Sequence, residues 1–404
     1  MFRERDRKHR SMNALTPLDS NKSTDPVIHL FEPLALRGTT LKNRVVVSPM
    51  SMYSSNEGFS DEFHLVHLGR FALGGAGLVI MEATAVNRAG RITHGCNGIW
   101  LDAHVPNLKR IAEFIRRFGS VPGIQLGHSG PKGAAQRPWD GNGPLGPEDA
   151  IQRQEHSWTT VSASPVPFEP GWATPRELTE SDMDDLVFDY RNAARRASAA
   201  GFDLIELHCA HGYLLHSFLS PLFNSRSDSF GGSLENRMRF PLRIVEAVRA
   251  EWPKSKPLVV RISAVDGVGV GWSINDSVVF TKALSARGVD AIACSTGGAK
   301  LARDQVLVSR ERGFQVPFAA HIRRATGVPT IAVGLILEAE QAEDVLRAEN
   351  ADLIALGREM LVNPNWAAQA AVALRKDVGW KEWPDQYGWW LERRARQLTR
   401  RNAS

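Results

Sequence analysis

The feature that most constrains the fold is a regular alternation of short apolar segments with segments of helical periodicity. Eight apolar segments predict buried strands, at residues 45–48, 78–83, 123–126, 203–208, 258–262, 290–294, 330–333 and 352–356. Helical patterns follow them at 62–73, 104–118, 181–200, 235–251, 275–287, 314–326, 338–348 and 365–375. Strands that alternate with helices predict an α/β fold with a parallel sheet, and eight such units predict a closed (β/α)8 TIM barrel.

Three further segments modify this plan. A hairpin is expected at 30–41, with Arg37 and Gly38 as its turn, before the first strand. The connections after the third and fourth strands, 128–178 and 212–234, are extended, and the first is rich in Gly, Pro and Trp. A connection of that length predicts a lid or substrate loop. It contains a G-x-G-x-x-G match at 141–146, but Pro144 interrupts it and no strand leads into it, so no Rossmann domain is predicted.

Charge is concentrated at the two ends of the 404-residue chain. Of the net charge of +5, residues 1–27 carry +2 and residues 375–404 carry +4, which leaves the body at −1. We therefore expect a disordered basic arm at 1–27, a barrel at 28–375 and a C-terminal tail at 376–404. A nearly neutral body gives no reason to expect a nucleic-acid partner.

Cysteine usage and hydropathy indicate the compartment. The three cysteines, Cys96, Cys209 and Cys294, are too few and too scattered for a disulfide framework, which indicates a reducing environment. No run of about 18 apolar residues suggests a membrane span, and the N-terminus has no apolar signal segment. A cytoplasmic protein without a membrane partner is expected.

The fourth predicted strand carries the most informative polar residues. It ends in His208, and His211 and Tyr213 follow at once. Catalytic side chains of barrel enzymes lie at the carboxyl ends of the strands, where two imidazole N–H groups could stabilise negative charge on one substrate oxygen. A zinc site would need further ligands at suitable spacing, which the sequence lacks, so no metal is predicted. A satisfied pair of core histidines is the other structural alternative.

Other strand ends contribute polar or small residues in a consistent order. Pro49, Met50, Ser51 and Tyr53 follow the first strand; the next ends hold Ala83, Gln125, Arg261 and the pair Gly357 and Arg358. A glycine and an arginine after strand eight favour a phosphate. A buried Gln suits an imide-like ring edge, and a buried Arg needs an anion or an electron-rich carbonyl. Together they suggest flavin mononucleotide (FMN). Singly, Gln125 could cap a loop, Arg261 could pair with Glu206 or Asp266, and Arg358 could be a surface cation.

Several motifs resemble one known family. The segments 41–44 (LKNR), 48–53 (SPMSMY), 124–126 (IQL), 208–214 (HCAHGYL), 219–221 (LSP), 224–226 (NSR), 231–237 (GGSLENR) and 357–358 (GR) are similar to the old yellow enzyme family of FMN-dependent ene-reductases. The likeness is strongest to its bacterial xenobiotic-reductase, or thermophilic-like, branch. It covers about residues 28–395.

The resemblance implies an activity and a set of site residues. NAD(P)H would be the transient reductant of tightly bound, non-covalent FMN, and an α,β-unsaturated carbonyl or nitro compound would be the substrate. His208 and His211 would bind the substrate oxygen, Tyr213 would donate a proton to carbon, and Tyr53 would touch the substrate. The cofactor would be held by Pro49, Met50, Ser51, Ala83, Gln125, Arg261, Gly334, Gly357 and Arg358.

The resemblance also implies a homodimer or homotetramer in which Trp389 or Trp390 completes a neighbouring subunit's pocket. One departure concerns Ser51, which stands where this branch usually has a cysteine beside the flavin; we expect a changed flavin potential with activity retained. Two alternatives stay open, namely a flavin-binding barrel without turnover, such as a redox sensor, and an aldolase-like barrel without flavin.

Overall fold

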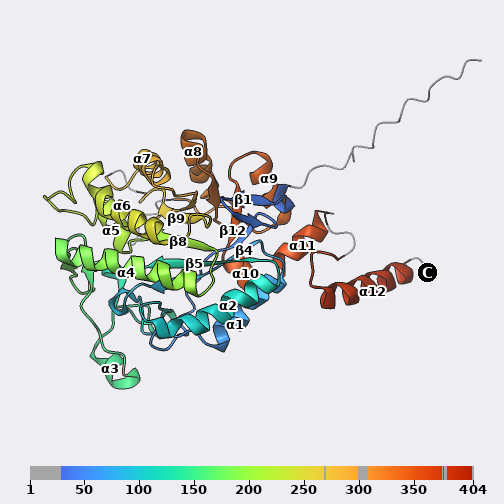
Figure 1. Cartoon of the computed structure of the whole chain (residues 1–404), viewed down its shortest axis with the longest axis horizontal. Helices are drawn as coiled ribbons and strands as arrows, with labels where there is room; N and C mark the ends of the chain where they lie inside the picture. The colour runs from blue at the N-terminus through green and yellow to red at the C-terminus, as the bar shows by residue number, and fades with distance from the viewer. Residues whose placement is uncertain (1–28, 268–269, 299–307, 375, 377–379, 403–404) are drawn as a thin grey trace, which may run out of the picture.

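A closed barrel of eight parallel strands forms the centre of the protein (Figure 1). The structure is a computed structural model that describes residues 29–267, 270–298, 308–374, 376 and 380–402. The barrel strands are β3 (Val45–Val47), β4 (Leu78–Ala85), β5 (Val121–Gly127), β8 (Leu204–Cys209), β9 (Leu258–Ser263), β10 (Ala291–Ser295), β11 (Thr330–Ala332) and β12 (Leu353–Leu356). Strand β12 pairs with β3 and closes the barrel, which confirms the predicted fold. The arm predicted at 1–27 lies outside the described residues.

A helix follows each strand and packs on the outside of the barrel (Figure 1). These helices are α1 (Glu62–Leu73), α2 (Val105–Arg117), α4 (Glu180–Ala199), α6 (Leu234–Glu251), α7 (Ile274–Ser285), α8 (Val316–Thr326), α9 (Ala339–Arg347) and α11 (Trp366–Ala373). Each overlaps the helix predicted from periodicity. No helix in the described ranges is both long and apolar enough to cross a bilayer.

Side chains alternate between the two faces of each barrel strand and so form two hydrophobic layers, one between the strands and the helices and one inside the barrel. Val45 and Val47 of β3 point outward and pack with the helices, whereas Val46 points inward and packs with Leu78 and Ile80 of β4. This period of two also aims every second residue near a strand's carboxyl end into the barrel mouth.

The predicted hairpin closes the other end of the barrel. Strands β1 (Leu34–Leu36) and β2 (Thr39–Leu41) pair antiparallel, and Leu36 and Leu41 join the interior layer. The turn residue Arg37 has a positive φ of 51°. Its Nε donates a hydrogen bond of 2.6 Å to Oδ1 of Asp290. That bond fixes the hairpin to the barrel floor.

The two long connections contain short elements of their own. The first holds α3 (Pro147–Arg153) and the two-residue strands β6 (Val161–Ser162) and β7 (Arg176–Glu177); the second holds α5 (Leu214–Leu219). The glycine motif at 141–146 precedes α3 inside an insertion rather than following a barrel strand, so it lacks the strand-to-helix setting of a dinucleotide-binding motif.

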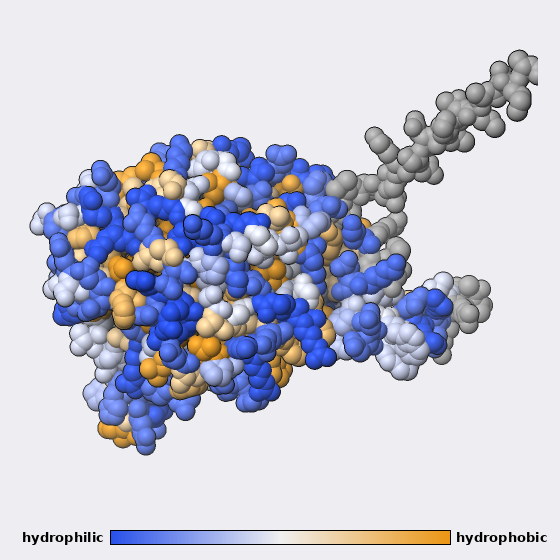
Figure 2. All heavy atoms as spheres, in the orientation of Figure 1, coloured by the Kyte–Doolittle hydropathy of each residue, from blue (hydrophilic) through white to orange (hydrophobic). Residues whose placement is uncertain are grey.

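The C-terminal region forms a helix that stands apart from the barrel. Helix α10 (Arg358–Val362) directly follows β12, whereas α12 (Asp385–Asn402) extends beyond α11 and away from the strands (Figure 1). The face shown in Figure 2 is largely hydrophilic over the barrel helices, with small scattered apolar patches. The segment predicted as a tail therefore contains a long helix.

Candidate active site

Four polar side chains meet at the barrel mouth because strand register places them side by side. Gln125 of β5 pairs with Glu206 of β8, and His208 of β8 pairs with Arg261 of β9. Val121, Leu204 and Val259 of these three strands face the barrel interior. The four polar residues lie two or four positions further along the same strands, so their side chains face inward as well. The site is therefore built on rigid strands, as the sequence predicted.

Glu206 is the central charge of this group. It is 1% exposed and accepts a hydrogen bond of 2.6 Å from the amide nitrogen of Gln125. Burial raises the pKa of Glu206, and the positive charge of Arg261 opposes that shift. One N–H of the Gln125 amide is thus engaged with Glu206, which leaves its amide oxygen and its second N–H to meet a ligand.

Arg261 is a half-buried cation with one buried, unsatisfied donor. Burial lowers the pKa of its guanidinium, and the Glu206 carboxylate raises it. Nε of Arg261 is buried and has no hydrogen-bond partner among the described residues. Because a buried, unpaired N–H group is costly, this position calls for an electron-rich ligand atom.

The two predicted histidines lie in contact and form a directed hydrogen-bond chain. The backbone N–H of Ala210 donates to Nδ1 of His208, so the proton of this ring is on Nε2. Nε2 of His208 lies 3.3 Å from Nδ1 of His211, and Nε2 of His211 lies 2.7 Å from Oγ of Ser295. Burial lowers the pKa of both rings well below the ordinary value, and Arg261 lowers both further. Both imidazoles are therefore neutral donors at neutral pH.

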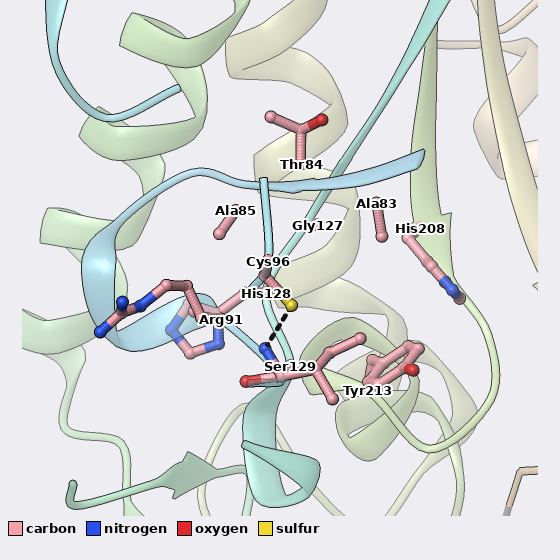
Figure 3. A pocket seen from close by; sticks show the side chains of 12 residues that line it. Ala83, Thr84, Ala85, Arg91, Cys96, Gly127, His128, Ser129, His208 and Tyr213 are labelled. Atoms are coloured by element: carbon pink, nitrogen blue, oxygen red, sulfur yellow. Dashed lines mark hydrogen bonds between the residues drawn. The ribbon is translucent and has the colours of Figure 1, made fainter. Parts of the chain in front are cut away.

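Tyr213 lies against these rings. Its ring packs edge-on against His208 with the centroids 4.8 Å apart. Figure 3 shows both side chains, with Ala83, Cys96 and Ser129, among the residues that line a cavity of about 20 Å³. Burial raises the pKa of Tyr213 above the ordinary value, so its hydroxyl keeps its proton at neutral pH.

The loop after β3 is held by a carboxylate that sequence reasoning missed. Glu82 lies at a register shift in β4 and accepts a 2.8 Å hydrogen bond from the backbone N–H of Met52. Its other oxygen lies 3.3 Å from Nε2 of His64 in α1. A lone acid inside the apolar strand 78–83 was the available signal. Glu82 fixes the loop in which Tyr53 adopts a positive φ of 52°.

Tyr53 itself lies at the edge of the first insertion. Its ring meets Trp139 edge-on at 6.2 Å, and its backbone oxygen accepts a 3.2 Å hydrogen bond from Arg137. Burial raises the pKa of Tyr53, and a hydrogen bond with Ser51 partly offsets this. Ser51 and Tyr53 thus lie in contact within the loop after β3.

A larger cavity of about 940 Å³ opens at the ends of β10, β11 and β12. Its lining includes Gly334, Gly357 and Arg358, which were predicted from the sequence, and also Gln315 and Asp266. Pro49 instead lines a cavity of about 10 Å³ inside the barrel with Glu206 and Arg261. Met50 packs partly buried against the hydrophobic core. Gly334, Gly357 and Arg358 thus lie together at one cavity, whereas Pro49 and Met50 lie elsewhere.

Two predicted site residues do not reach the mouth of their own barrel. Trp389 and Trp390 lie on α12 and are 49% and 67% exposed. Their rings touch edge-on, with centroids 4.5 Å apart. The described residues contain no cluster of three or more His, Cys, Asp or Glu side chains able to hold a metal ion.

Comparisons with known proteins agree with this geometry. Residues 29–377 match the model of the NADH:flavin oxidoreductase / NADH oxidase family. The chain is 42% identical to a NADPH dehydrogenase of Listeria innocua over 360 residues, which cover 89% of this chain and 98% of that protein. It is 43% identical to a NADPH dehydrogenase of Geobacillus sp. over 347 residues, covering 85% and 94%.

Solved structures show the same fold. Morphinone reductase is 25% identical, with a TM-score of 0.72 and coverage of 87% of this chain and 91% of that one. A 2-naphthoyl-CoA reductase complex has a TM-score of 0.77 at 22% identity, covering 85% and 52%, and this likeness shows the fold alone.

Burial of a neutral histidine makes stability depend on pH. Burial lowers the pKa of His128 to about 4, against about 6.5 in an unfolded chain. The associated stability is fully present above about pH 6.5 and is lost as the pH falls toward 4, by up to roughly 1.4 kcal/mol per pH unit. We expect His128→Asn, whose side-chain oxygen can accept the Gly130 N–H that Nδ1 accepts at 3.0 Å, to flatten this dependence.

Urea unfolding at several pH values measures the effect. The wild-type free energy of unfolding should fall more steeply than that of the variant between pH 6.5 and 4. Parallel curves would show that His128 does not titrate on unfolding.

Proposed function

The chain belongs to the NADH:flavin oxidoreductase / NADH oxidase family, and on this premise we propose that it is an FMN-dependent NADPH dehydrogenase that reduces activated C=C bonds. The resemblance to old yellow enzymes is confirmed by the family match. The proposed substrates are α,β-unsaturated carbonyl or nitro compounds. The observation that carries this proposal is the neutral histidine pair beside a protonated, half-buried tyrosine at a barrel mouth.

The residues at the mouth fit FMN. The orphaned Nε of Arg261 and the free amide oxygen of Gln125 complement a ring that has both acceptor and N–H edges. The cavity of about 940 Å³ offers Arg358 for a phosphate, with Gly334 and Gly357 leaving room for it. When bound, FMN supplies the hydride chemistry that links NADPH oxidation to substrate reduction.

We propose that His208 and His211 bind and polarise the substrate oxygen. Both rings are neutral, so they donate hydrogen bonds without carrying a full charge. The N–H of His208 donates to His211 and that of His211 to Ser295, so a substrate oxygen binds both rings by replacing these acceptors. Donors that are already oriented stabilise the negative charge that develops on this oxygen.

Tyr213 is the proposed proton donor. Its raised pKa keeps the proton on the hydroxyl until a strongly basic carbon develops in the substrate. His208 packs edge-on against the ring and fixes its orientation. The ammonium group of Lys132 lies 5.0 Å from the ring centroid, where its charge stabilises negative charge on the phenol oxygen.

An absorption experiment tests the function. The purified protein, supplied with FMN, should show a bound-flavin spectrum that bleaches with anaerobic NADPH and returns on addition of 2-cyclohexenone. A spectrum that never bleaches would favour a flavin-binding protein without turnover. A protein that cannot bind FMN would favour a barrel enzyme of aldolase type.

Replacement of Tyr213 tests the proton donor. We expect Tyr213→Phe to slow reoxidation of the reduced flavin by 2-cyclohexenone about 10²- to 10⁴-fold, because general acid catalysis contributes rate factors of this size. Stopped-flow absorbance measures both half-reactions, and bleaching by NADPH should change much less.

Tyr190→Phe is the matched control. Tyr190 is a fully buried tyrosine of α4 whose hydroxyl has no hydrogen-bond partner among the described residues. Loss of the Tyr190 hydroxyl should leave the rates of both half-reactions unchanged. Equal reoxidation rates for Tyr213→Phe and wild type would remove Tyr213 from the mechanism.

We further propose that α12 contacts a second copy of the chain and completes its substrate pocket. The adjacent indoles of Trp389 and Trp390 are exposed on a helix that stands away from its own barrel. Tryptophans on such surfaces commonly dominate the binding energy of an interface.

A double substitution tests this arrangement. Trp389→Ala/Trp390→Ala should weaken self-association about 30-fold or more in sedimentation experiments, since loss of a dominant interface residue costs about 2 kcal/mol. It should also raise the KM for 2-cyclohexenone. The control Leu398→Ala replaces another exposed apolar residue of α12. An unchanged association constant and KM would exclude the role of α12.

A further inference from the structure

The turn that carries His211 and Tyr213 has an unusual backbone conformation. His211 and Gly212 are consecutive residues with positive φ, 61° and 74°. For a residue with a Cβ this conformation costs on the order of 1 kcal/mol or more, so neighbouring contacts must hold it. The substrate-binding geometry therefore depends on what anchors this turn.

Several hydrogen bonds anchor the turn from different elements. Oγ of Ser263 in β9 accepts the N–H of His211 at 3.0 Å, and Lys132 donates to the His211 carbonyl at 3.0 Å. The N–H of Gly212, between the two functional residues, donates at 2.9 Å to Nδ1 of His216 in α5. This last bond requires a lone pair on Nδ1.

His216 can accept that bond in only one tautomer. It is fully buried, and a ring that accepts at Nδ1 must carry its proton on Nε2. Nε2 lies 3.2 Å from Oδ1 of Asp266, in a contact that is close but not well aligned. Neither atom has another partner in the described ranges. The carboxylate of Asp266 therefore favours the proton at Nε2 and leaves Nδ1 free.

Asp266 is itself held in place on its other oxygen. Oδ2 accepts hydrogen bonds from Oγ of Ser220 at 2.6 Å and from the backbone N–H of Trp272 at 2.7 Å. Asp266 is fully buried. An aspartate with both oxygens directed at donors has a fixed orientation, and it transmits that orientation to His216.

We propose that Asp266 and His216 form a positioning pair that fixes the 211–213 turn and thereby aims His211 and Tyr213 at the substrate. The pair acts through the Gly212 N–H and does not touch the substrate. This inference rests on the proposed function for its catalytic consequence, whereas the tautomer of His216 is independent of any activity.

Asp266→Asn tests the pair because an amide cannot replace both carboxylate oxygens. If the amide nitrogen faces His216, Nε2 must become the acceptor, the proton moves to Nδ1, and the Gly212 bond is lost. If it faces the other way, two N–H donors, from the amide and from Trp272, point at each other. Either orientation loosens the turn. We expect reoxidation by 2-cyclohexenone to slow about 10- to 100-fold, as for other groups that orient a functional side chain.

Two readouts separate positioning from a general structural defect. In protein with ¹⁵N-labelled histidine and glycine, the wild-type spectrum should show the Nε2–H tautomer of His216 and a hydrogen-bonded Gly212 amide, both changed in Asp266→Asn. Because Asp266 also lines the larger cavity, a direct effect on cofactor binding must be excluded. The dissociation constant of FMN should therefore differ by less than about twofold between Asp266→Asn and wild type. The exposed Asp184→Asn is the matched control.

Variants of His216 complete the test. In His216→Asn the side-chain oxygen can accept the Gly212 N–H without any choice of tautomer, so reoxidation by 2-cyclohexenone should be largely retained. Adding Asp266→Asn to this variant should then slow reoxidation less than about threefold. His216→Leu should reproduce the loss. An unchanged His216 tautomer and Gly212 resonance in Asp266→Asn would overturn the inference, as would equal effects of Asp266→Asn in both backgrounds. Absence of enone reduction in wild type would defeat the proposed function and leave the tautomer result valid.

Discussion

The site depends on one constraint, that polar groups buried at the ends of parallel strands must each find a partner. Glu206 meets it within the protein, since it accepts from Gln125 and faces the charge of Arg261. Arg261 does not, because its Nε has no partner in the described part of the chain. The described residues thus leave one buried donor without a partner, on a residue that lines the small cavity inside the barrel. That unsatisfied donor favours an electron-rich cofactor edge over a purely structural role.

Charge and proton position follow from the same burial. Burial and the nearby Arg261 keep His208 and His211 neutral, so each ring has one N–H and one lone pair. The backbone N–H of Ala210 fixes the first proton, and the direction then passes from His208 to His211 and on to Ser295. The chain of donors therefore has a single polarity. A neutral donor pair suits an oxygen that becomes anionic only during reaction, because it does not bind a resting anion strongly.

Backbone conformation is held by residues outside the predicted site. Tyr53 and His211 both have positive φ, and both lie next to a buried carboxylate system, with Glu82 anchoring the first loop and Asp266 acting through His216 on the second. Glu82 accepts the backbone N–H of Met52, in the loop that carries Tyr53. Asp266 accepts the backbone N–H of Trp272, outside the turn that carries His211. Strained functional loops persist only where such contacts determine them fully.

The barrel, its helices and the placement of several site residues could be predicted from the sequence. Apolar segments and a period near 3.6 are local properties, so the eight strands, their helices and the placement of Gln125, His208 and Arg261 at strand ends could all be predicted. The motifs that carry the resemblance are local as well.

The hydrogen bonds that connect these residues could not be predicted from the sequence. Ser263 and Ser295 were missed because the predicted strands ended one residue too early, at 262 and 294. The roles of Glu82 and of the Asp266–His216 pair depend on contacts across 30 and 50 residues. A hydrogen-bond partner, a tautomer or a positive φ is set by the register between strands and by packing of distant loops, which no local periodicity encodes.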